Sequence, residues 1–119
     1  MYRALLAARR KLYGDGSTQL NTTLDGLARV REKMGDTTSA EPFVRELVTI
    51  TTAARPATDS TLLARKVWLG TTLCASGKAA EGGRLIREVL TTIAPRDTSG
   101  VRVARQAVDA CDARAPKLR

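Results

Sequence analysis

The sequence predicts an all-α protein built as a stacked array of antiparallel helical hairpins. Three observations predict it: a self-similar period of 42 residues, apolar side chains at helical spacing along the chain, and glycines where helices must end. Gly35 and Gly77 lie one period apart, and Arg45 is matched by Arg87. A fixed period of ~20–50 residues is typical of repeat arrays, whose function lies on a shared surface.

The apolar residues recur at i, i+3, i+4 and i+7, and no segment alternates strictly as a half-buried strand would. In order, the stripes begin at Met1, Leu20, Ala40, Leu62, Leu85 and Val101. They predict about six helices, at 1–13, 18–34, 39–54, 60–75, 79–93 and 99–113. In a single domain spanning 1–119, the first helix is half of a hairpin and the last is a cap, and the complete repeats are 18–54 and 60–93.

The predicted helix boundaries have local causes. Gly35 and Gly77 are expected to end helices because glycine adopts the left-handed conformation without steric cost. The connectors are 14–17, 55–59 and 94–97. Helix starts are expected where a side chain can accept a backbone N–H: at Asp59, at Asp97 and, as a capping box, at Thr38 with Glu41.

Composition argues against a catalytic domain. The chain has no His, no phosphate-binding loop and no apolar run long enough to span a bilayer. Gly82 and Gly83 lie within a helical pattern and are interpreted as a weakened helix start. We therefore expect no enzyme activity, no cofactor, no metal and no membrane segment.

The two cysteines, Cys74 and Cys111, lack C-x-x-C spacing. They are expected to be small buried residues rather than a disulfide framework, with redox sensing as the alternative. This favours a reducing cytoplasmic location.

A net charge of +8 raises the alternative of nucleic-acid binding, since Lys and Arg neutralise phosphates. The basic residues are scattered through several helices, however, and the aromatic content is only 3%, too low for a base-stacking platform. Nucleic acid is therefore not the expected partner.

A family resemblance is carried by Leu24-x-x-Leu27-Ala28, then Gly35-Asp36, then the run from Ala40 to Leu47. This order resembles the tetratricopeptide repeat, in the 42-residue variant of kinesin light chains and many bacterial proteins. Leu12-Tyr13-Gly14-Asp15 is similar to the connector of that variant. The resemblance implies a right-handed α-solenoid; HEAT or armadillo repeats, with periods of ~40–47 residues, are the alternative.

The resemblance also implies a function. In this family the first helix of each hairpin lines a concave groove that takes an extended peptide or a partner helix. Carried over to this sequence, the groove positions are Thr22, Asp25, Gly26, Arg29, Glu32 and Lys33, then Ala64, Val67, Trp68, Thr71, Cys74 and Ala75.

Two interpretations of the groove residues stay open. Arg29, Glu32 and Lys33 either contact a charged peptide or form an ordinary solvated helix face. Trp68 is either a binding anchor, of the kind enriched at hot spots, or an inter-repeat packing residue.

Met1 aligns with Phe43, inside a hairpin rather than at its start. We therefore expect the C-terminal part of a larger protein, similar to bacterial signalling proteins that place such repeats behind a Ser/Thr kinase or regulator domain. The expected function is a protein-interaction or scaffold module. A homodimer formed through the terminal helices is the alternative to a longer array.

Overall fold

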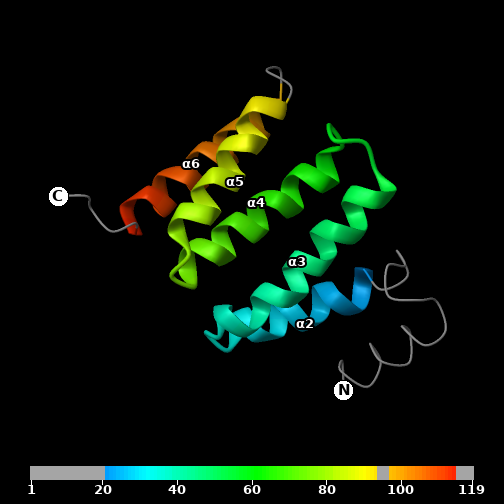
Figure 1. The fold of residues 1–119 in the computed structure, drawn as a ribbon, viewed down its shortest axis with the longest axis vertical. Helices are drawn as coiled ribbons and strands as arrows, with labels where there is room; N and C mark the ends of the chain where they lie inside the picture. Colours follow the sequence, from blue (N-terminus) through cyan, green and yellow to red (C-terminus); the bar gives the residue numbers. More distant parts are fainter. Residues whose placement is uncertain (1–20, 94–96, 115–119) are drawn as a thin grey trace.

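A computed structural model describes residues 21–93 and 97–114, and in these ranges every regular element is an α-helix (Figure 1). The helices are α2 Asn21–Lys33, α3 Thr37–Ala54, α4 Ser60–Ala75, α5 Ala79–Thr92 and α6 Thr98–Arg114. The all-α prediction is confirmed, and the helices pack as antiparallel hairpins. The helix expected at 1–13 lies outside the described residues. None of the described helices is long and apolar enough to cross a membrane.

Both hairpin turns depend on the predicted glycines. Gly35 has φ +76° and Gly77 has φ +85°, the left-handed region that side chains disfavour. The residue after each glycine closes the turn in the same way: the Asp36 N–H donates to the Arg31 carbonyl at 2.9 Å, and the Lys78 N–H donates to the Leu73 carbonyl at 2.8 Å. The 42-residue period therefore repeats a turn geometry as well as a composition.

The helix starts agree with the sequence in two of three places. Asp59 accepts the Leu62 N–H at 3.1 Å, and Asp97 accepts the Gly100 N–H at 3.0 Å, as predicted. The capping box at Thr38 and Glu41 is wrong. Asp36 caps α3 instead by accepting the Ser39 N–H at 3.2 Å, because α3 begins earlier than expected, at Thr37.

Glu41, free of the capping role, joins the two hairpins. Its carboxylate, only 12% exposed, lies 3.0 Å from the Lys78 ammonium and 3.1 Å from the Arg45 guanidinium, which also contacts Glu81 at 3.1 Å. Burial opposes the charged form, but the hydrogen bonds from Lys78 and Arg45 outweigh it and lower the pKa of Glu41. An ion network thus ties α3 to the α4–α5 turn.

We expect Glu41→Gln to reduce the free energy of unfolding at pH 7 by about 1–3 kcal/mol, since the variant loses hydrogen bonds to a charged group. A lowered folded-state pKa contributes stability above the unfolded-state pKa and loses it as the pH falls through the folded-state value. Urea unfolding should therefore show the difference at neutral pH and a smaller one in acid.

The matched control is Glu81→Gln, which removes an exposed partner of the same Arg45. It should cost less than about 1 kcal/mol. A Glu41→Gln deficit that is equally large in acid would contradict the assignment of the effect to the Glu41 charge.

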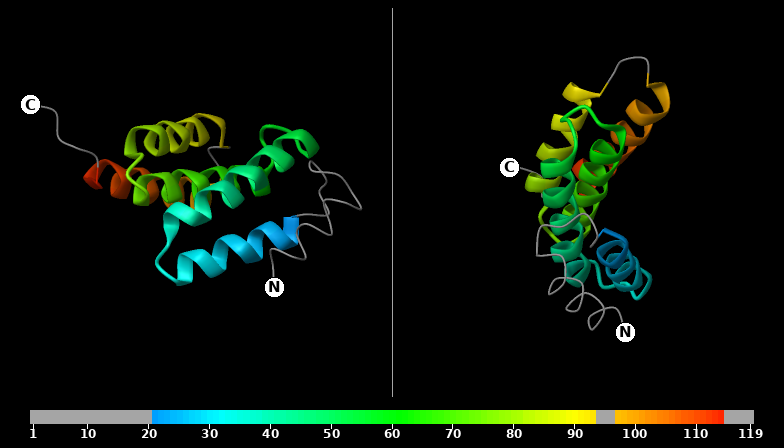
Figure 2. Two further views of the ribbon diagram at one scale, coloured as in Figure 1. Left: turned by 60° about the horizontal axis from the view of Figure 1, so that its bottom comes forward. Right: turned by 90° about the vertical axis from the view of Figure 1, so that its right-hand side faces the viewer.

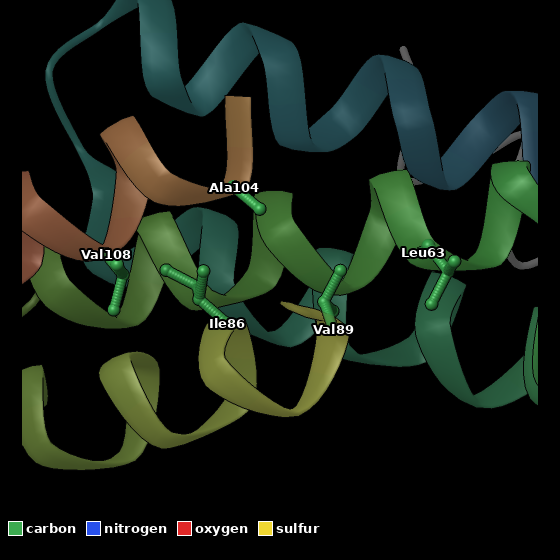
Figure 3. Packing of buried hydrophobic residues seen from close by; sticks show 5 residues of the cluster. All are labelled: Leu63, Ile86, Val89, Ala104 and Val108. Atoms are coloured by element: carbon green, nitrogen blue, oxygen red, sulfur yellow. The ribbon is translucent and has the colours of Figure 1, made fainter. Parts of the chain in front are cut away.

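The core is continuous through the three C-terminal helices, which lie side by side (Figures 1 and 2). Leu63 from α4, Ile86 and Val89 from α5, and Ala104 and Val108 from α6 meet in one buried cluster (Figure 3). Burial of each Leu, Ile or Val side chain in this cluster stabilises the fold by roughly 1.5–3 kcal/mol. Because α4 contacts α3, α5 and α6, it is the central helix of the described fold.

The packing of α2 differs from that of the other helices. Its backbone lies close to α3 alone among the described helices, whereas α4 also lies against α6 (Figure 2). Leu24 and Leu27 of α2 pack with Leu47 and Ile50 of α3. Only side chains bridge the space between α2 and α4, and this opening becomes the candidate site below.

The cysteine prediction requires correction. Cys74 of α4 and Cys111 of α6 form a disulfide, with their Cα atoms 5.3 Å apart. Both residues are buried, as expected, but they are bonded to each other. The expectation of a reducing cytoplasm depended on unpaired cysteines, and that premise is wrong.

Candidate functional site

The opening between α2 and α4 forms a polar pocket of about 650 Å³. Its walls come from the facing sides of the two helices: Asp25, Arg29, Glu32, Ser60, Thr61, Ala64, Arg65 and Trp68. On α2, Asp25, Arg29 and Glu32 follow the i, i+4, i+7 spacing and therefore lie on one face. On α4, Thr61, Arg65 and Trp68 follow the same spacing.

Trp68 lines this polar pocket from α4. Its ring packs partly against the α2–α3 core, beside Phe43, while its indole N–H donates to a Glu32 carboxylate oxygen across the opening. The indole thus has its polar edge satisfied and its apolar body half-buried, which fixes its orientation.

The Arg29 guanidinium lies over the Trp68 ring. The guanidinium carbon lies 4.8 Å from the ring centroid, within the range of a cation–π contact. Its Nε also donates to the Asp25 carboxylate at 2.5 Å, and this hydrogen bond raises the pKa of Arg29. The side chain of Arg29 is nevertheless 63% exposed, so the pair is a surface interaction.

Arg65 completes the wall on α4. Its Nη1 donates to the Thr51 hydroxyl at 2.6 Å, and Thr51 in turn donates to the Leu47 carbonyl. This chain of hydrogen bonds anchors the Arg65 guanidinium between α3 and α4 and keeps it partly buried at the edge of the polar pocket.

A second hollow, the apolar slot, adjoins the polar pocket. It has a volume of about 290 Å³ and lies between the first turns of α4 and α6 and the end of α5, lined mainly by Leu63, Ala64, Val67, Val89, Ile93 and Val103. Val103 is among the few large apolar side chains of the described residues that are exposed. Ser60 and Ala64 line both hollows, so the two form one surface across α2, α4 and α6.

The structure brings together half of the residues proposed for the groove. Asp25, Arg29, Glu32 and Trp68 line the polar pocket, Val67 lines the apolar slot, and Ala64 lines both. Thr22, Lys33 and Thr71 are exposed but line neither hollow.

The structure also bears on the two interpretations left open for the charged groove residues and for Trp68. Arg29 and Glu32 contact Trp68 rather than solvent alone, and Trp68 combines core packing with a pocket surface. Cys74, also carried over to the groove, is bonded to Cys111.

Sequence reasoning missed Arg65 and the apolar slot. Arg65 carries a signal that was available, since it lies one turn before Trp68 on the same helix face. No local sequence pattern indicates the apolar slot, because its walls come from three helices whose relative placement depends on tertiary packing.

No protein-family model, curated protein or solved structure matches this chain. Within residues 21–93 and 97–114, no group of three or more Cys, Asp or Glu side chains is placed to hold a metal ion.

Proposed function

We propose that this chain is a tetratricopeptide-like protein-interaction module that binds a peptide segment of a partner across α2, α4 and α6. One observation carries the proposal: the polar pocket and the apolar slot adjoin through Ser60 and Ala64. A peptide crossing these two residues would place one side chain against Trp68 and another in the slot. Concave sites that combine apolar walls with a few convergent polar groups are typical of ligand binding.

The charges of the described fold favour this proposal over nucleic-acid binding. Thirteen Lys and Arg and eleven Asp and Glu lie in 21–93 and 97–114, a net charge of +2, against +8 for the whole chain. Several of these cations are also paired with carboxylates, as Arg29, Arg45 and Arg87 are. These ranges, with nearly balanced charges and internal ion pairs, offer little for a phosphate backbone; the other +6 of the net charge belongs to residues 1–20, 94–96 and 115–119.

The test is selection of peptides from a displayed random library, followed by affinity measurement. We expect selected peptides to bind with micromolar Kd and to lose at least tenfold in affinity on Ala64→Arg, because a long side chain there obstructs both hollows. Ala64 is exposed, so this variant should fold.

The control is Ala80→Arg, an exposed alanine on α5 that lines neither hollow and should leave binding unchanged. Selection that yields no saturable binder, or binders indifferent to Ala64→Arg, would rule out the proposed surface. Duplex binding that weakens steeply with salt would instead favour nucleic acid, and a mass that rises with concentration would favour self-association.

A further inference from the structure

The polar pocket holds a positive group that belongs to the chain itself. The Arg29 guanidinium is surrounded by the Trp68 ring, by the Asp25 carboxylate and, one helical turn away, by the Glu32 carboxylate, whose charge also favours protonated Arg29. An aromatic face combined with carboxylates is a recognition site for guanidinium and ammonium groups. The three side chains therefore form a cation site that Arg29 fills.

The contact between Arg29 and Trp68 does not follow from close packing of the α2 and α4 backbones. The backbones of α2 and α4 do not lie close together, and the pocket of about 650 Å³ lies between them. Trp68 crosses this space to reach Glu32, so the aromatic ring and the Glu32 carboxylate are held by a contact that does not involve Arg29. Removal of the Arg29 side chain would leave the ring and the carboxylates facing an open hollow.

Arg29 is also weakly held. It belongs to the same helix as Asp25, at i, i+4 spacing, and it is 63% exposed, conditions under which an ion pair contributes little. An external guanidinium could make the same contacts with Trp68 and Asp25, while Arg29 swings into solvent. Arg65, the other cation of the pocket, is occupied with Thr51 and does not compete for these carboxylates.

We infer that Trp68, Asp25 and Glu32 form a site for an arginine or lysine side chain of the bound peptide, and that Arg29 plugs this site when no peptide is present. This inference rests on the proposed function and adds the chemical class of its ligand. Arg29 is then an internal competitor, so removal of the Arg29 side chain should improve peptide binding.

The experiment uses Trp68, the single tryptophan of the chain, as the reporter. The Arg29→Ala variant is titrated with N-acetyl-arginine amide while Trp68 fluorescence is recorded at ~0.15 M salt, where the Debye length is about 8 Å. We expect a saturable change with a millimolar midpoint, at least fivefold lower than that of the unaltered chain. The neutral isostere N-acetyl-citrulline amide should give no saturable change.

Two further variants make the result specific. Arg29→Ala combined with Asp25→Asn should weaken the response at least fivefold, whereas Arg84→Ala, on the exposed surface of α5, should respond as the unaltered chain does. A response of Arg29→Ala that is absent, or equal for citrulline, would overturn the inference.

The outcome is separable from that of the peptide selection. Selected peptides that bind without Arg or Lys, at an affinity unchanged by Arg29→Ala, would leave the interaction module standing and remove the cation site. A cation response without any selected peptide would leave the cation site standing and remove the interaction module.

Discussion

Loss of the Cys74–Cys111 disulfide is expected to reduce the free energy of unfolding by about 3–4 kcal/mol, a large part of the total stability of a domain of this size. The bond joins residues 37 apart in sequence. A closed loop of that length removes a corresponding amount of conformational freedom from the unfolded chain. In the folded state the bond connects the last turns of α4 and α6.

The loss should be measured by urea unfolding of the oxidised chain and of the Cys74→Ala, Cys111→Ala double variant. The sulfur atoms are buried, so reductant reaches them only when the fold opens. A reduced form of the unaltered chain, for comparison, should therefore be prepared in denaturant and then refolded. Reductant must leave the double variant unaffected, which separates loss of the bond from other effects of the reagent.

The bond also predicts where the fold opens first. The disulfide ties α6 directly to α4, and α6 otherwise contacts only α4 and α5 among the described helices, so loss of the bond should loosen α6 more than the central helices. Amide hydrogen exchange in α6 should accelerate more than exchange in α3 or α4. Equal stability of the oxidised chain and the double variant would show that helix packing alone holds α6 in place.

The hairpins themselves could be predicted because their signals are local. A left-handed turn requires glycine, so Gly35 and Gly77 mark two turns without knowledge of the fold. Buried positions also repeat at the period, since Val44 and Ile86, 42 residues apart, are both fully buried. Ala28 and Ala40 of the first hairpin are fully buried too. Five of the twelve proposed groove residues line the polar pocket for the same reason, since helical spacing defines a face.

The placement of α6 could not be predicted in this way. It begins at Thr98, 38 residues after Ser60, so the 42-residue period does not extend to it. The disulfide and the apolar slot both depend on where α6 lies against α4, and both were missed. The absence of close backbone contact between α2 and α4, where the polar pocket lies, likewise arises from tertiary packing rather than from a local pattern.

The second large effect is expected at Gly82, where α5 crosses α4. A Cβ atom added to Gly82 would collide with the Gly70 carbonyl oxygen and lie 2.6 Å from the Cys74 sulfur. One period earlier, the equivalent positions are Ala28 and Ala40, so the second hairpin packs more tightly than the first. This corrects the interpretation of Gly82 as only a weakened helix start.

Gly82→Ala is therefore expected to reduce the free energy of unfolding by about 1–3 kcal/mol, because overpacking outweighs the gain in helix propensity. The adjacent Gly83→Ala is a matched control with the opposite sign. Its Cβ would meet only the flexible end of Arg87, at 3.0 Å, and the Cys111 sulfur, at 3.7 Å. That variant should gain up to about 1 kcal/mol from helix propensity. Equal gains for both variants in urea unfolding would contradict the close approach of α4 and α5.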